Sequence, residues 1–156
     1  GQPWRKAGRI VAPAADRLAM LRLALENEPA FRVETLELDR PGPSYTADTL
    51  EALRSARPDD ELFLIVGEDA LADLPNWVRP ERILELATPA VARRADVPKA
   101  AAERPPGLSE RVVRLKMPLL AVSATEIRDR VRRGLPVDDL VPPAVEAYIR
   151  EHGLYR

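Results

Sequence analysis

The segment Val122-Ser-Ala-Thr-Glu-Ile-Arg128 combines residue types that suit the binding of a phosphate. Ser123 followed three residues later by Glu126 is a capping box, so a helix is predicted to begin at Ser123. A helix N-terminus offers free N–H groups and a partial positive charge to an anion, and Thr125 and Arg128 add a hydroxyl and a planar cation. Because capping boxes are common, the spacing alone divides the interpretation evenly between a phosphate site and a plain, well-capped helix.

Two further segments carry groups that suit a small aromatic ligand. Pro43-Ser-Tyr-Thr-Ala-Asp-Thr-Leu50 can present hydroxyls and backbone donors, although taken alone it favours a helix cap with a surface tyrosine. Trp77 is flanked by Pro75-Asn76 and Arg79-Pro80, which predict a loop. A tryptophan usually belongs to the core, but an indole in a loop can stack on a flat heterocycle.

Gly67-Glu-Asp69 follows the apolar run 62–66, which predicts a strand buried on both faces of a parallel sheet. Gly67 would let a ligand approach the backbone closely, and the Asp69 carboxylate would hold ribose hydroxyls. Taken alone, Asp69 is better interpreted as the N-cap of the next helix. Lys6 and Arg94 are candidates for phosphate contacts, although each alone is better interpreted as a solvated charge.

The hydrophobic pattern predicts that helices and strands alternate along the chain. Helices are expected to begin near Pro13, Ser44, Pro80, Ser123 and Pro142 or Pro143. Strands are expected at 31–38, 62–66, 89–92 and 112–122, with a surface loop over 93–110. Such alternation predicts an α/β fold whose parallel sheet is covered by helices, with ligands bound beyond the carboxyl ends of the strands.

Composition narrows the class of protein. The 156 residues predict one domain spanning 1–156, and the net charge of -1 gives no reason to expect nucleic acid or a membrane surface as a partner. The sequence has no cysteine, which excludes disulfides and thiolate chemistry, and its single histidine excludes a multi-histidine metal site. No protein-bound metal is predicted. We expect a cytoplasmic protein, and the composition leaves its oligomeric state open.

Six segments, in order, resemble the bacterial nicotinate-nucleotide adenylyltransferases. They are Gly1-Gln-Pro-Trp-Arg-Lys6, Asp16-Arg17-Leu18-Ala19-Met20-Leu21, the "PSYTxDTL" signature at 43–50, the "GxDxL…W" segment at 67–77, the "ISSTxIR"-like segment at 122–128 and the tail at 141–155. The resemblance implies a Rossmann-like parallel sheet of the nucleotidyltransferase superfamily. It also implies the reaction of ATP with nicotinate mononucleotide to give deamido-NAD and pyrophosphate, a step of NAD synthesis with Mg²⁺ delivered on the ATP.

The resemblance also assigns roles by position. Tyr45, Thr46 and Trp77 would hold the nicotinate ring and its carboxylate. The residues expected to bind the nucleotide are Lys6, Gly67, Asp69, Arg94, Ser123, Thr125 and Arg128. Among them, Arg128 is also expected to contribute to catalysis, through the ATP phosphates.

The sequence departs from the family pattern in two places. Ala124 stands where the family has a second serine, which removes one hydroxyl but leaves the backbone donors. The family's opening "GxFxPxHxGH" motif, whose histidines contact the ATP phosphates, does not occur in these 156 residues. We therefore expect a chain that is truncated at its N-terminus and is inactive or impaired by itself.

Two alternatives remain open from the sequence. One is a sister nucleotidyltransferase that acts on nicotinamide mononucleotide or phosphopantetheine. The other is a non-catalytic nucleotide-binding module that has lost the histidine motif.

Overall fold

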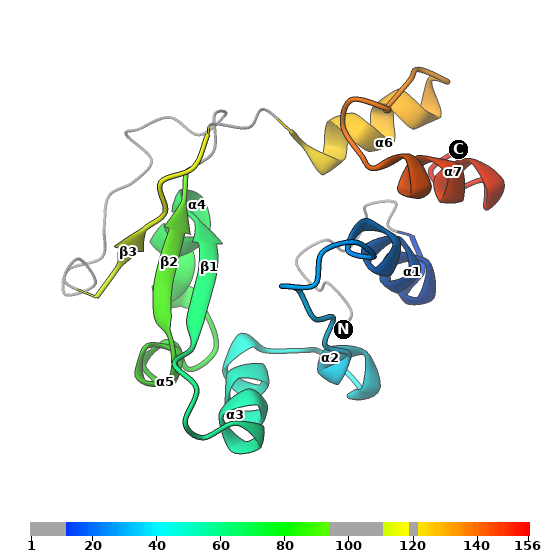
Figure 1. Cartoon of the computed structure of the whole chain (residues 1–156). Coiled ribbons are helices and arrows are strands. Elements are labelled where there is room, and N and C mark those ends of the chain that lie inside the picture. Colours follow the sequence, from blue (N-terminus) through cyan, green and yellow to red (C-terminus); the bar gives the residue numbers. More distant parts are fainter. Residues whose placement is uncertain (1–11, 94–110, 119–121) are drawn as a thin grey trace. The chain divides into compact units, whose positions relative to one another are not determined.

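The computed structural model describes residues 12–93, 111–118 and 122–156, and the chain divides into two compact units (Figure 1). The sheet unit comprises residues Ser44–Ala121. The helical unit joins Gly1–Pro43 to Val122–Arg156. The boundaries of a single domain over 1–156 stay a prediction.

The sheet unit is built on three parallel strands, as the sequence predicts. β1 (Phe63–Gly67), β2 (Thr88–Ala92) and β3 (Val113–Arg114) lie side by side in the order β1-β2-β3. In the register of β1 and β2, Gly67 is paired with Ala92. The carboxyl ends of these two strands therefore meet at one edge of the sheet, which is where ligands bind in open α/β sheets.

Helices of the sheet unit pack around two apolar clusters. They are α3 (Thr46–Ala56), α4 (Glu68–Asp73), the short 3₁₀ helix η2 (Leu74–Asn76) and α5 (Pro80–Leu86). One cluster joins α3 to α5 through Ala47, Leu50, Ile83, Leu86 and Ala87, and the other joins α4 and η2 to the sheet through Val66, Leu71, Leu74 and Val91. α3 and α5 begin within two residues of Ser44 and Pro80, as the sequence predicts. Proline suits the first position of α5 because its missing N–H has no partner within the helix.

The prediction that β1 is buried on both faces is wrong. Val66 is buried, whereas Phe63 and Ile65 are 50% and 68% exposed. Successive side chains of a strand point to opposite faces of the sheet. Leu64 and Val66 pack with α4 and η2 residues, while the face that carries Phe63 and Ile65 stays open in the described structure.

The helical unit contains α1 (Ala14–Ala24), α2 (Leu36–Asp39), α6 (Ala124–Arg132) and α7 (Pro143–Glu151). α1 packs against α7, and the Tyr148 hydroxyl donates a hydrogen bond of 2.9 Å to Asp16 Oδ1. α6, α7 and α1 begin within two residues of the positions that the sequence predicts.

The strand predicted at 31–38 is not formed. Residues 31–35 are irregular, and Leu36–Asp39 make one helical turn in which Thr35 Oγ1 donates to Asp39 Oδ2 over 2.9 Å. Phe31 is 63% exposed, so its alternation with Val33 serves no buried sheet face. The strand predicted over 112–122 shrinks in the described residues to Val113–Arg114.

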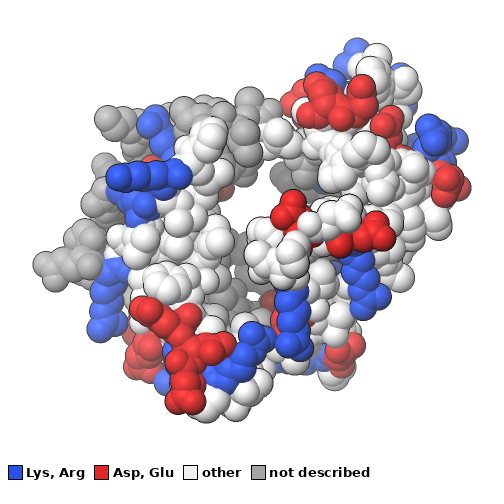
Figure 2. Space-filling model, in the orientation of Figure 1, with Lys and Arg blue, Asp and Glu red and all other residues white. Residues whose placement is uncertain are grey.

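Charged side chains of both signs are intermixed on the face shown in Figure 2, and neither sign dominates it. Acidic and basic residues are nearly equal in number, 25 against 24. In the part of the chain that the structure describes, no helix has the length and apolar character needed to cross a membrane.

Candidate active site

Ser123 caps the N-terminus of α6, as the capping box predicts. Its Oγ accepts hydrogen bonds from the N–H groups of Thr125 and Glu126, over 3.2 and 3.4 Å. The Glu126 carboxylate pairs with Arg130 at 3.2 Å, one turn further along the helix. The backbone N–H groups of the first turn of α6 are thus available at a helix N-terminus, as phosphate binding requires. A phosphate there would compete with Ser123 Oγ for two of these donors.

Arg128 lies on the same first turns of α6. Its Nη2 donates to Thr125 Oγ1 over 3.2 Å, so the guanidinium and the hydroxyl form one polar group. The positive charge of Arg128 also affects the pKa of Tyr155. Burial raises the pKa of the Tyr155 phenol, and the positive charges of Arg128 and Arg17 act against that rise.

Tyr45 and Thr46 begin α3, where Tyr45 is the N-cap residue and Thr46 the first helical residue. Tyr45 is half-buried, and its carbonyl accepts from the backbone N–H of Thr49 at 3.2 Å. The predicted helix start is confirmed. The side chains of Tyr45 and Thr46 stand at a helix N-terminus, where hydroxyl and backbone donors are both available.

Trp77 ends η2 and joins the two apolar clusters of the sheet unit. Its indole packs against both clusters, and Nε1 donates to Asp73 Oδ2 over 3.1 Å. The predicted loop position is confirmed, but Trp77 is also partly a core residue. An indole that is fixed on one side and partly exposed on the other has the geometry of a stacking platform.

Gly67 and Asp69 lie at the carboxyl end of β1, as predicted. Gly67 has φ −76° and ψ 166°, a conformation open to any residue, so the backbone itself does not require glycine here. Gly67, not Asp69, is the N-cap of α4, so the interpretation of Asp69 as an N-cap is wrong. Asp69 is exposed in the first turn of α4, where a negative charge complements the helix dipole.

The sequence alone did not identify Glu68, which lies between these two residues, as a candidate site residue. It is the one charged side chain among the buried residues described, with 8% exposed. Its Oε1 lies 3.7 Å from Arg114 Nη1 across the sheet, and its Oε2 is buried with no hydrogen-bond partner among the described residues. Only the position next to Gly67, at a strand's carboxyl end, hints at this residue in the sequence.

The structure divides the predicted site residues between the units. Tyr45, Thr46, Gly67, Asp69 and Trp77 belong to the sheet unit, and Ser123, Thr125 and Arg128 to the helical unit. Lys6 and Arg94 lie outside the described residues. The described residues contain no group of three or more side chains suited to hold a metal ion.

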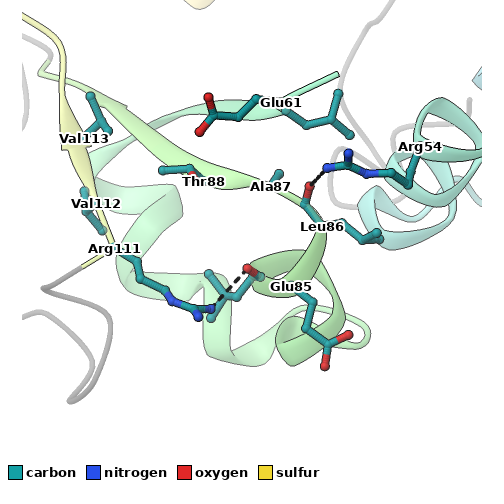
Figure 3. A pocket seen from close by; sticks show the side chains of 11 residues that line it. Arg54, Glu61, Glu85, Leu86, Ala87, Thr88, Arg111, Val112 and Val113 are labelled. Carbon is teal, nitrogen blue, oxygen red and sulfur yellow. Dashed lines mark hydrogen bonds between the residues drawn. The ribbon is translucent and has the colours of Figure 1, made fainter. Parts of the chain in front are cut away.

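A pocket of about 550 Å³ opens at the other end of the sheet (Figure 3). Its lining includes Thr88 and Val113, the first residues of β2 and β3, so it lies at the amino ends of the strands. Arg54 Nη2 donates to the Leu86 carbonyl over 3.1 Å, and Arg111 reaches the last turn of α5 in the same way. These two guanidinium groups thus satisfy carbonyls at a helix C-terminus.

Known proteins resemble this chain over most of its length. The family model described as cytidylyltransferase-like matches residues 1–130. The chain is 45% identical over 159 residues to a protein of Thermomicrobium roseum named probable nicotinate-nucleotide adenylyltransferase, covering all of this chain and 74% of the relative. A protein of the same name from Thermus thermophilus is 48% identical over 146 residues, with 94% of this chain and 75% of the relative covered.

Solved structures show the same fold. Nicotinic acid mononucleotide adenylyltransferase of Plasmodium falciparum, complexed with APC, matches 93% of this chain with a TM-score of 0.72 and 17% identity. The same enzyme complexed with NaAD matches 96% with a TM-score of 0.73. At this low identity the likeness supports the nucleotidyltransferase fold alone, whereas the sequence relatives show the family. The chain belongs to the nicotinate-nucleotide adenylyltransferase family, within the cytidylyltransferase-like proteins.

Proposed function

We propose that the protein transfers the adenylyl group of ATP to nicotinate mononucleotide, giving deamido-NAD and pyrophosphate. The observation that carries the proposal is the 45% identity, along the whole chain, to a relative whose name states this activity. The proposal includes MgATP as the form of the nucleotide substrate and the cytoplasm as the site of the reaction.

The chemistry is a single in-line displacement. A 5′-phosphate oxygen of nicotinate mononucleotide attacks the α-phosphorus of ATP, and the bond from that phosphorus to the bridging oxygen of pyrophosphate breaks. Negative charge moves onto the leaving pyrophosphate, so the protein's contribution is positioning and charge stabilisation. Mg²⁺ bound to the polyphosphate neutralises part of that charge.

Residues of α6 are suited to the donor side of this reaction. The N-terminal N–H groups of α6 carry partial positive charge, and the Arg128 guanidinium stands beside Thr125 on the same turn. In the proposed site, Ser123, Thr125 and Arg128 bind the ATP phosphates. Lys6 and Arg94 add cations to the phosphates, and Gly67 and Asp69 line the nucleotide cleft.

Residues of α3 and η2 are suited to the acceptor side. Trp77 offers a fixed indole face for the nicotinate ring, held by Asp73 at its Nε1. Tyr45 and Thr46 would supply hydrogen-bond donors to the nicotinate carboxylate from the start of α3. A charged carboxylate and a neutral amide differ at this point only, so this half of the site decides between nicotinate and nicotinamide.

The test is turnover by the gene product that contains this sequence. We expect deamido-NAD and pyrophosphate in equal amounts from ATP and nicotinate mononucleotide. Equal rates with nicotinamide mononucleotide, or faster turnover of phosphopantetheine, would replace the proposal by the sister-enzyme alternative. ATP binding without turnover of any of the three would favour the non-catalytic module.

A substitution tests the role of Arg128. We expect Arg128→Ala to lower kcat/KM for ATP by about a hundredfold, because it removes a positioned cation from the developing charge. Arg132→Ala is the matched control, since Arg132 lies on the same helix and pairs with Asp129 at 2.5 Å. An equal effect of the two substitutions would remove Arg128 from the proposed site.

A further inference from the structure

Five charged side chains link α3 to the chain segment that follows Trp77. Arg79 donates to both carboxylate oxygens of Glu51, over 3.1 and 3.2 Å, and also pairs with Asp48. Arg82 donates from Nε to Glu51 over 3.0 Å and from Nη1 to Glu85 over 2.8 Å. In Figure 1, α3 and α5, which carry these residues, lie beside one another in the sheet unit.

Arg79 differs from Arg82 in where its backbone stands. Arg79 is the N-cap residue of α5 and has φ 55° and ψ 58°, the left-handed conformation, whereas Arg82 lies inside the helix. A side chain other than glycine is disfavoured in that conformation, which persists only where the surrounding structure holds it. The paired carboxylates of α3 supply that hold through the Arg79 side chain.

Arg79 stands at the end of the short segment that carries Trp77. On its N-terminal side, Asp73 accepts from Trp77 Nε1, and the Trp77 N–H donates to the Leu74 carbonyl over 3.0 Å. On its C-terminal side, only Val78 separates Trp77 from Arg79. The indole also packs against the cluster that contains Ala47 and Leu50 of α3.

α3 is the helix that Tyr45 and Thr46 begin. The contacts of Arg79 with Asp48 and Glu51 therefore join the two segments to which the proposed function assigns the nicotinate ring and its carboxylate. The guanidinium is engaged by two carboxylates in this arrangement, so its contacts assign it a role in holding the two segments together. The pairing also lowers the pKa of the Glu51 carboxyl, through the hydrogen bond from Arg82 and then through the positive charge of Arg79.

We propose that Arg79 is a positioning residue of the acceptor side, which fixes Trp77 relative to the start of α3. The inference rests on the proposed function for its substrate, nicotinate mononucleotide, but not for the contacts themselves. Its rival is a surface ion network that adds a little stability and nothing else. Arg79, Asp48 and Glu51 are all partly exposed, so stability alone would show only a small effect.

The experiment compares Arg79→Gly with Arg82→Ala in the full gene product. Glycine tolerates the left-handed conformation, so the first variant removes the side chain without adding backbone strain. Arg82→Ala removes a cation from the same Glu51 but leaves the Trp77 segment tied to α3. We expect Arg79→Gly to raise KM for nicotinate mononucleotide about tenfold and KM for ATP less than about twofold, because only one substrate is misplaced.

Arg82→Ala is expected to change both KM values less than about twofold, as an exposed pair does. Asp48→Asn combined with Arg79→Gly should be no worse than Arg79→Gly alone, because Arg79→Gly has already removed the contact between Arg79 and Asp48. Equal KM effects of Arg79→Gly and Arg82→Ala, or an equal rise of KM for ATP, would overturn the inference.

A second measurement separates this inference from the proposed function. In a background in which Trp4 and any tryptophan outside these 156 residues are replaced by phenylalanine, the fluorescence of Trp77 reports its surroundings whichever substrate the enzyme uses. We expect Arg79→Gly to shift the Trp77 emission and increase its quenching by acrylamide, with Arg82→Ala unchanged. If the parent protein fails to turn over nicotinate mononucleotide, the proposed function falls; an unshifted Trp77 emission in Arg79→Gly would overturn the positioning role instead.

Discussion

The two units hold their candidate site residues by different means. In the sheet unit, Trp77 packs between two clusters whose Leu74 and Ile83 are fully buried. In the helical unit, neither α1 nor α6 contains a buried residue along its described length, and Arg128 is arranged by a helix cap and polar contacts. The acceptor side should therefore depend on apolar packing, and the phosphate side on hydrogen bonds.

The largest expected effect tests the packing side of this comparison. Leu74→Ala should lower the free energy of unfolding by about 2–5 kcal/mol, because it opens a cavity beneath the Trp77 segment. Urea unfolding followed by Trp77 fluorescence, with the other tryptophans replaced by phenylalanine, measures it. Leu21→Ala in α1 is the control, since Leu21 is 47% exposed and should cost well under about 1 kcal/mol.

Equal losses in the free energy of unfolding for Leu74→Ala and Leu21→Ala would contradict this difference between the units. Packing would then not distinguish the sheet unit from the helical unit. A Leu74→Ala protein that unfolds normally but loses turnover would instead show that the cluster acts on the geometry of the site rather than on stability.

A smaller effect is expected at the cap of α6. Ser123→Ala should lower the free energy of unfolding by about 1 kcal/mol, because the Oγ that accepts from Thr125 and Glu126 is removed. Urea unfolding checks the stability, and KM for ATP checks the second role. The same change frees two N–H groups for a phosphate, so a cap alone predicts an unchanged or lower KM for ATP.

A raised KM for ATP in Ser123→Ala would show that the hydroxyl itself contacts the nucleotide. Ser123→Thr is the matched control, because threonine keeps a hydroxyl that can cap the helix. An unchanged stability in Ser123→Ala would show that the hydroxyl of Ser123 does not stabilise the start of α6.

The sequence predicts local features of this fold better than distant ones. The helix starts at Pro80 and Ser123 depend on signals within a few residues, namely a proline at the first helical position and a hydroxyl that caps the first turn. The strand expected at 31–38 failed because alternation alone does not supply a partner strand, and pairing is decided by residues far along the chain.

The same limit applies to the candidate site. Trp77 and Ser123 were predicted by neighbouring residues, and the structure confirms their local surroundings. The burial of Glu68 and the contact of Arg79 with α3 depend on residues 46 and 31 positions away, Arg114 and Asp48. No local pattern encodes such contacts, so the sequence alone assigns neither residue a role.

The smallest expected effect concerns the junction of α1 and α7 in the helical unit. The hydrogen bond from Tyr148 to Asp16 raises the pKa of the phenol above its ordinary value of 10.0, and burial acts in the same direction. A pKa raised on folding gives a stabilisation that is complete below the unfolded value and is lost as the pH rises through the folded one. The parent protein should therefore lose Tm as the pH rises above about 10.

Tyr148→Phe removes the titrating group, so its Tm should be lower than that of the parent near neutral pH and should fall less steeply on the alkaline side. Tyr155→Phe is the matched control, because the pKa of Tyr155 is raised mainly by burial and Tyr148 keeps its bond to Asp16. If both variants flatten the alkaline slope equally, burial and not the hydrogen bond governs the junction. The junction of α1 and α7 would then depend on burial, as the sheet unit does. Stabilisation by hydrogen bonds would distinguish the helical unit only at the first turn of α6.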